Sequence, residues 1–159
     1  MLAILTTHPI QYQVPLWQAL SKDGAVPFEV WYLSDHGARP GYDPQFGKSF
    51  SWDLDMLSGY PYRFIRTNKG ARLGRFERLR LGEPLSKLFR EKKVNAIWVQ
   101  GWQVLAYWQA VRQAHRAGVE VWLRGESNDL AVTPVWKKPF KRLLLKQFFR
   151  RVDRFLYIG

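Results

Sequence analysis

The 159-residue chain contains no cysteine, which excludes disulfides, thiolate metal ligands and a cysteine nucleophile. It has no apolar run near the roughly 20 residues that a membrane-spanning helix needs. It also lacks a G-x-G-x-x-G motif, a Walker loop and a G-x-S-x-G nucleophile elbow. The common dinucleotide, nucleoside-triphosphate and serine-hydrolase sites are therefore not indicated. The histidines, His8, His36 and His115, lack metal-ligand spacing, so we expect no protein-held metal.

Acidic residues are scarce, with 13 against 25 basic ones and a formal net charge of +12. Such an excess favours an anionic partner, which is phosphate, nucleic acid or acidic lipid. Hydrophobic residues make up 47% of the chain, which indicates one folded domain over residues 1–159. Met1 leads straight into a strand-like run with no basic stretch before it, so we expect no signal peptide. The expected location is the cytoplasm, including the inner face of the membrane.

Strand and helix patterns alternate along the chain. Short apolar runs predict strands at 2–6, 28–33, 62–65, 96–99, 119–123 and 155–158. Helical spacing, Pro15 and the glycines Gly24 and Gly118 predict helices at 15–23, 83–92, 104–117 and 136–152. We expect the first helix to bury Leu16, Ala19 and Leu20, and a further short strand near 50–52.

This alternation predicts a Rossmann-like α/β fold, with a parallel sheet in strand order 3-2-1-4-5-6 and helices on both faces. Such sheets bind ligands beyond the carboxyl ends of their strands, near the switch point between strands 1 and 4. The loops selected by that rule cover residues 7–13, 100–103 and 124–129, together with the excursion 34–61.

The first loop carries His8, Gln11, Tyr12 and Gln13. Histidine exchanges a proton near neutral pH, glutamine amides bind sugar hydroxyls, and a tyrosine ring offers a flat face to a sugar. The following helix points its N-terminus at this loop, which favours a phosphate there. The alternative is that these side chains only satisfy the backbone of the turn.

The loop after the fifth strand carries Arg124, Gly125, Glu126 and Ser127. Arg124 suits bidentate binding of a phosphate or carboxylate, Gly125 permits close approach of a ligand, and Glu126 can accept from hydroxyls. The alternative is a helix N-cap cluster that starts at Ser127.

The loop after the fourth strand carries Gln100, Gly101 and Trp102. Trp102 is a candidate for stacking on a sugar or a lipid, and the alternative is a tryptophan of the core.

The predicted helix 136–152 is strongly basic, with a stripe formed by Lys138, Arg142, Lys146 and Arg150. Residues at a four-residue step are expected to face the core: Phe140, Leu144, Phe148 and Val152. Leu145 and Phe149 fall outside that step, and apolar groups beside basic ones suit an anionic membrane surface. The alternative is a solvated basic face.

Three stretches together resemble the N-terminal domain of GT-B glycosyltransferases of the family 4 kind. They are residues 7–16 (THPIQYQVPL), residues 46–47 with 52–60 (FG, WDLDMLSGY), and residues 123–127 (LRGES). The chain departs from that family by having Pro9-Ile10 where many members have a glycine pair. It also has Gln100-Gly101-Trp102 where many have a histidine.

The resemblance implies one half of a GT-B fold, the acceptor-side domain of a retaining glycosyltransferase, inactive without a C-terminal nucleotide-sugar domain. It implies transfer from a nucleotide-sugar donor to a glycan or lipid-linked acceptor, with no cofactor and no metal. His8 and Glu126 are then the catalytic candidates. The substrate-binding candidates are Gln11, Tyr12, Gln13, Gln100, Gly101, Trp102, Arg124, Gly125 and Ser127.

Two other classes remain open. One is a basic α/β binding module for nucleic acid or anionic surfaces, which the net charge favours. We expect helices to cover both faces of the sheet, so no sheet face would expose aromatic residues on which bases could stack, and this argues against nucleic-acid binding. The other is a small flavodoxin-like enzyme that is complete in itself.

Overall fold

The computed structural model describes residues 1–36, 38, 41–43, 48–50, 55–69, 71, 78–125 and 138–157. Its main sheet has six strands in the order β5-β2-β1-β6-β7-β8, and every neighbouring pair is parallel. The strands are β1 (Leu2–Thr6), β2 (Phe28–Tyr32), β5 (Tyr62–Phe64), β6 (Ala96–Val99), β7 (Glu120–Arg124) and β8 (Arg154–Leu156). In chain order this is 3-2-1-4-5-6, so the predicted Rossmann-like sheet is confirmed.

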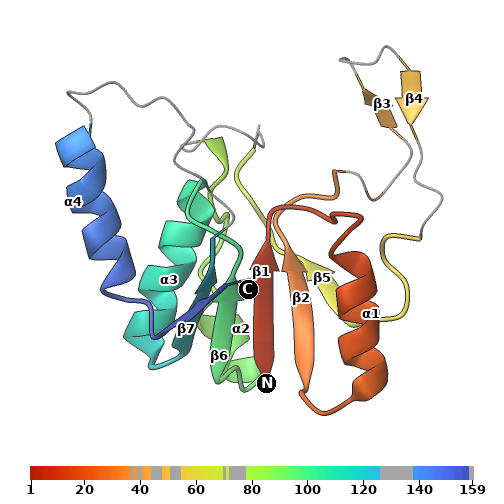
Figure 1. Cartoon of the computed structure of the whole chain (residues 1–159), viewed down its shortest axis with the longest axis horizontal. Coiled ribbons are helices and arrows are strands. Elements are labelled where there is room, and N and C mark those ends of the chain that lie inside the picture. The colour runs from red at the N-terminus through yellow and green to blue at the C-terminus, as the bar shows by residue number, and fades with distance from the viewer. Residues whose placement is uncertain are drawn as a thin grey trace.

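A second, two-stranded antiparallel sheet pairs β3 (Gly41–Asp43) with β4 (Lys48–Phe50). It stands apart from the main sheet in Figure 1. The short strand expected near 50–52 therefore lies slightly earlier in the chain, and residues 51–52 fall outside the described residues.

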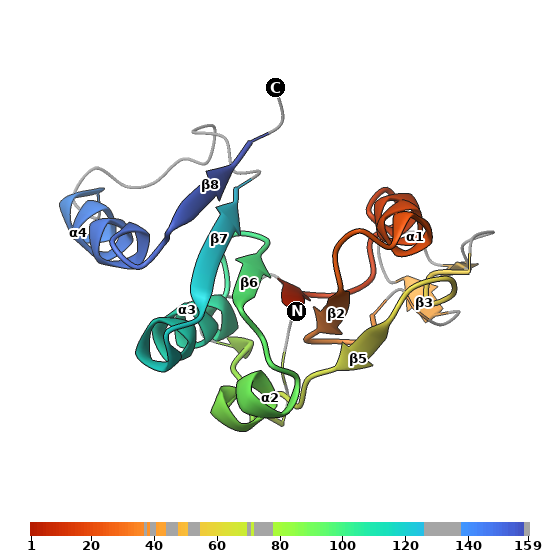
Figure 2. The same cartoon turned by 90° about the horizontal axis from the view of Figure 1, so that it is seen from below.

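Helices cover both faces of the main sheet. They are α1 (Val14–Asp23), α2 (Ser86–Glu91), α3 (Leu105–Ala117) and α4 (Lys138–Phe149). Figure 2 shows α1 on one side of the sheet and α2 and α3 on the other. The helices α1 and α3 end at Gly24 and Gly118, whose φ angles of 68° and 67° are left-handed, as the sequence predicts.

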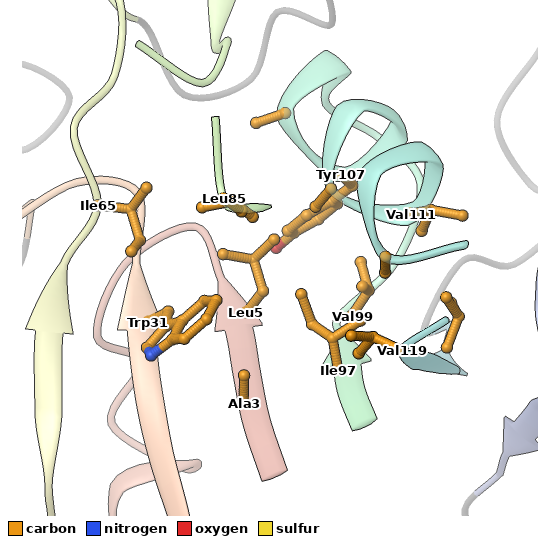
Figure 3. Close-up of a cluster of buried hydrophobic side chains, with 14 of the residues drawn as sticks. Ala3, Leu5, Trp31, Ile65, Leu85, Ile97, Val99, Tyr107, Val111 and Val119 are labelled. Atoms are coloured by element: carbon orange, nitrogen blue, oxygen red, sulfur yellow. The ribbon is translucent and has the colours of Figure 1, made fainter. Parts of the chain in front are cut away.

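The two central strands, β1 and β6, are almost wholly apolar because alternate residues pack into two different cores. Leu5 and Ile97 belong to the core beneath α2 and α3, which also holds Tyr107 and Val111 (Figure 3). Ile4, the neighbour of Leu5, belongs to the core beneath α1. Both faces of β1 are therefore sealed from water, which suits its position at the centre of the sheet.

The expected inner face of α1 is wrong at Leu16, which is 39% exposed, and at Ala19, which is exposed. Leu20 is partly buried and packs against the core, as expected. The helix instead buries Val14 and Trp17, which are three residues apart. Trp17 sets this rotation because its ring packs edge-on against Trp98, with 5.5 Å between the ring centroids.

The expected core face of α4 is also wrong over most of its length. Phe140 and Leu144 are 67% and 40% exposed, whereas Phe148 is 2% exposed and Val152 is partly buried against the core. Phe148 packs on Trp108 of α3 at 4.7 Å between ring centroids. The helix lies beside the edge of the sheet (Figure 2), and among its apolar residues named above only Phe148, near its C-terminal end, is buried.

A buried acid ties three elements together near the amino end of the sheet. Glu29 of β2 is 8% exposed and accepts hydrogen bonds from Arg63 of β5 at 2.7 and 3.0 Å, and from Lys92 after α2 at 3.2 Å. Trp31 Nε1 also donates to it at 2.7 Å. Burial by itself would raise the pKa of Glu29, but the hydrogen bonds from Arg63, Trp31 and Lys92 hold it below the usual value.

Candidate functional site

The carboxyl ends of β1 and β6 form the switch point of the sheet. The helix that follows β1, α1, covers one face, and the helix that follows β6, α3, covers the other (Figure 2). Thr6 ends β1, and Gln100 directly follows β6. Since Leu5 pairs with Val99, these two polar residues stand next to each other in register. The backbone amide of Gln100 donates to the carbonyl of Leu5 at 3.2 Å, which continues the pairing to the end of the strands.

Three polar side-chain atoms at this edge are buried without a hydrogen-bond partner in the described part of the chain. They are Thr6 Oγ1, Gln13 Oε1 and Gln100 Nε2, on residues that are 1%, 3% and 9% exposed. A buried polar atom left unsatisfied costs about 1–3 kcal/mol, so folded proteins rarely keep several together. Within the described residues, these three atoms therefore have no partner, and water, the rest of the chain or a polar ligand can supply one.

His8 lies in the same loop, between Thr6 and Gln13, and its ring is mostly buried. Its Nδ1 lies 2.9 Å from Thr7 Oγ1, and its ring meets that of His36 edge-on at 5.6 Å. Burial, and to a lesser degree the neighbouring His36, lower the pKa of His8 to about 4. The ring is therefore neutral at pH 7, so it can act as a hydrogen-bonding or proton-accepting group but not as a cationic phosphate ligand.

The other three predicted residues of this loop differ in their exposure to solvent. Gln13 is buried and begins α1, whereas Gln11 and Tyr12 are exposed, with Tyr12 at 58%. The structure thus brings Gln13 and His8 to the edge of the sheet and leaves Gln11 and Tyr12 on its rim. Those two residues are accessible to a ligand that extends outward from the edge.

The loop after β6 depends on a glycine. Gly101 has a φ of 122°, and a Cβ placed there would lie 2.0 Å from Gln103 Oε1. Trp102 is partly buried against the core, and its carbonyl accepts from Trp108 Nε1 at 2.8 Å. The Nζ atom of Lys141, from α4, lies 5.3 Å from the centre of the Trp102 ring. Trp102 therefore contacts both the core and a cation of α4.

The loop after β7 is described only at its start. Arg124 ends β7 beside Gln100, because Val99 pairs with Leu123, and its side chain is partly buried. Gly125 is exposed and has open space around it. Glu126 and Ser127 lie outside the described residues, so their predicted roles remain predictions. The described edge thus runs from Thr6 through Gln100 to Arg124 across three adjacent strands.

The predicted basic stripe lies on α4, away from the switch point (Figure 1). Arg142, Lys146 and Arg150 are exposed, and Lys138 begins the helix with a side chain outside the described set. Among the described helices, none combines the length and the apolar character that crossing a bilayer requires. No group of three or more potential metal ligands occurs within the described residues.

Sequence reasoning missed Thr6 and His36 as members of the site. Thr6 is the only polar residue of its strand, and it sits at the carboxyl end. His36 follows β2 at the same edge, inside the segment 34–61 that the rule for parallel sheets selects as part of the ligand-binding region. A search for polar residues within a few positions of each strand's carboxyl end would have found both.

No family model matches this chain, and no curated protein is similar enough to it to count as a relative.

Proposed function

We propose that this chain is the acceptor-binding half of a glycosyltransferase, which holds a hydroxyl-rich glycan or lipid-linked acceptor while a sugar is transferred from a nucleotide-sugar donor. The proposal includes a second domain that binds the donor. It rests on one observation above all: at the switch point, buried polar atoms of Thr6, Gln13 and Gln100 have no hydrogen-bond partner among the residues that the structure describes.

These atoms suit hydroxyl groups. Gln13 Oε1 can only accept, Gln100 Nε2 can only donate, and Thr6 Oγ1 can do either. A sugar hydroxyl both donates and accepts, so a polyol satisfies such a mixed set, whereas an anion can only accept. The neutral His8 adds a further hydrogen-bonding group, since burial lowers its pKa to about 4. Its place in the loop after β1 makes it the candidate to accept a proton from the reacting hydroxyl, and ligand binding would have to raise its pKa for it to act as an efficient base at pH 7.

The nucleic-acid alternative draws less support from the fold. Proteins that bind single strands without sequence preference stack bases on exposed aromatic rings beside a basic groove. Here helices pack on both faces of the sheet, and Trp31 and Tyr32 of the inner strand β2 are fully buried. The exposed aromatic residues of the sheet lie only on its two edge strands among those the structure describes, and they are Tyr62, Phe64 and Phe155. The net charge of +12 remains its chief support, and a filter-binding titration of RNA against salt tests it.

The first experiment is titration of the ¹⁵N-labelled chain with a panel of methyl glycosides, and separately with UDP, followed by amide chemical shifts. We expect at least one glycoside to shift signals of residues 6–13 and 99–103 with about millimolar affinity, and UDP to leave them unchanged. Gln100→Leu should abolish the shifts, and Gln147→Leu, on the exposed face of α4, should preserve them. Saturable UDP binding at this edge, or no glycoside binding, would contradict the acceptor-side assignment.

We also propose that α4 touches an anionic membrane surface, which would place a lipid-linked acceptor near the site. Its support is that exposed apolar residues, Phe140 and Leu143, share the helix with exposed Arg142, Lys146 and Arg150. Co-sedimentation with vesicles containing phosphatidylglycerol tests this. Binding should vanish with purely zwitterionic vesicles and weaken in Phe140→Ser; equal binding to both vesicle types would refute it.

A further inference from the structure

A groove of about 780 Å³ lies between α2 and α3, on the outer surface of the molecule. It shares no residue with the switch-point site. The segment 81–84 contributes lining residues, and the two walls come from the short helix α2 and from α3. Figure 2 shows these helices next to each other on the side of the sheet opposite α1. Its volume lies within the range of small-ligand sites.

Three arginines line the groove from both walls. Arg90 comes from α2, while Arg112 and Arg116 are one helical turn apart on α3, so they share a face. All three are exposed, and none takes part in an ion pair within the described part of the chain. Glu83 is the one acid among the lining residues. The groove therefore holds an excess of positive charge.

Two glutamines make the groove still richer in donors. Gln109 Oε1 accepts from the backbone amide of Leu81 at 2.8 Å, and Gln113 Oε1 accepts from that of Leu85 at 2.7 Å. A backbone N–H requires an acceptor, so these contacts fix the orientation of both carboxamides. The remaining end of each glutamine is an NH₂ group, and both residues line the groove.

From this arrangement we propose that the groove is a binding site for a phosphate-bearing ligand with more than one negative charge. Guanidinium groups bind phosphate oxygens in pairs, and the two NH₂ groups add donors that no acceptor among the described residues uses. Such a ligand is a phosphorylated small molecule or the phosphorylated headgroup of a lipid. The site goes beyond the proposed sugar-transfer function and does not depend on it.

Inorganic pyrophosphate is the first probe, titrated into the chain by calorimetry at low salt, with amide shifts to locate it. We expect saturable binding that shifts signals of residues 81–90 and 109–117. The decisive variant is Gln113→Glu, which keeps the oxygen that accepts from Leu85 but replaces the NH₂ donor by a charged oxygen. It should weaken binding at least about tenfold. Arg112→Gln should do the same, and circular dichroism of both variants checks that they fold.

The matched control is Gln147→Glu on α4, which makes the same change of charge at an exposed position outside the groove. It should leave the affinity for pyrophosphate within about twofold. Equal weakening in Gln113→Glu and Gln147→Glu would overturn the proposal, because only the net charge would then matter. Absence of pyrophosphate binding up to about 10 mM would overturn it as well.

Two further arms identify the source of the phosphate. Vesicles with phosphatidylinositol phosphate that bind the wild type but not Gln113→Glu would indicate a lipid headgroup. Binding of pyrophosphate without binding of these vesicles would indicate a soluble ligand, and either result supports the site. Duplex RNA that binds through the groove while pyrophosphate does not would overturn the small-ligand assignment. A failure here leaves the glycoside titration at the switch point unaffected, since the two sites share no residue.

Discussion

The two ends of the parallel sheet differ in how their buried polar side chains are hydrogen-bonded. At the amino end, Glu29 is surrounded by donors from Arg63, Trp31 and Lys92. At the carboxyl end, Thr6 and Gln100 keep buried polar atoms without partners in the described chain. A polar group that is fully hydrogen-bonded stabilises the fold, whereas one left unsatisfied destabilises it. The contrast separates Glu29, which holds the sheet together, from Thr6 and Gln100, which we propose as ligand contacts.

The largest expected effect on stability is at Glu29, at the amino end of the sheet. Replacing it in Glu29→Ala removes the acceptor that three donors share, and it leaves two cations facing each other. We expect the free energy of unfolding to fall by about 2–4 kcal/mol. A fully buried charge left without its partner would cost more, but Arg63 and Lys92 are partly exposed to solvent. Urea denaturation measures this loss.

The control for Glu29→Ala is Glu91→Ala, which removes an exposed pair with Lys87 at 3.6 Å. Exposed pairs of this kind contribute less than about 0.5 kcal/mol. If the two substitutions cost the same, Glu29 would not be the structural anchor described here.

At the carboxyl end the largest loss is expected at Gly101. Gly101→Ala forces a φ of 122° on a residue with a Cβ, and that Cβ would displace Gln103. We expect a loss of about 1–3 kcal/mol, measured by thermal unfolding. Gly125→Ala, where a Cβ meets open space, should be close to neutral. A neutral Gly101→Ala would show that the loop after β6 adapts freely.

The pH dependence of stability sharpens the comparison at His8. Its pKa in the folded protein is about 4, below the usual 6.5, so the unfolded chain binds a proton more readily. Stability should therefore be full above pH 6.5 and fall as the pH drops from 6.5 to about 4. We expect a decrease of roughly 1–2 kcal/mol, less than the whole shift would give, because the ring is partly exposed.

Urea denaturation between pH 4 and 7 measures this dependence. His8→Asn should lose the part of the pH dependence that belongs to this range, while His115→Asn, at an exposed position on α3, should retain it. An unchanged profile in His8→Asn would show that other groups cause it.

The smallest expected effect has the opposite sign. Thr6→Val replaces an unpartnered buried hydroxyl by a methyl group of similar shape. We expect stability to rise by up to about 1 kcal/mol, while any glycoside binding at the edge is weakened. Denaturation and the glycoside titration measure the two changes. A loss of stability in Thr6→Val would indicate that the hydroxyl serves the fold and would blur the difference between the two ends.

The fold was largely predictable because its signals are local. Continuous apolar runs mark β1, β2, β6 and β7 to within one residue, and Gly24 and Gly118 end their helices as expected. Alternation of the elements then predicts the strand order, because right-handed parallel crossovers permit few arrangements. The position of the candidate site follows from that order, which is why the sequence predicts His8, Gln13 and Gln100 near the carboxyl ends of β1 and β6.

The sequence by itself determined the strands, their order and the edge at which polar loops gather, since these depend on periodicity and on general rules of chain topology. Only the tertiary structure decided that Trp17 rather than Leu16 faces the core, and that His8 meets His36. It also decided that Glu29 is hydrogen-bonded to three side chains, while Thr6 Oγ1 has no partner among the described residues. Burial and hydrogen bonding depend on partners distant in the chain, and no local pattern encodes which of them will meet.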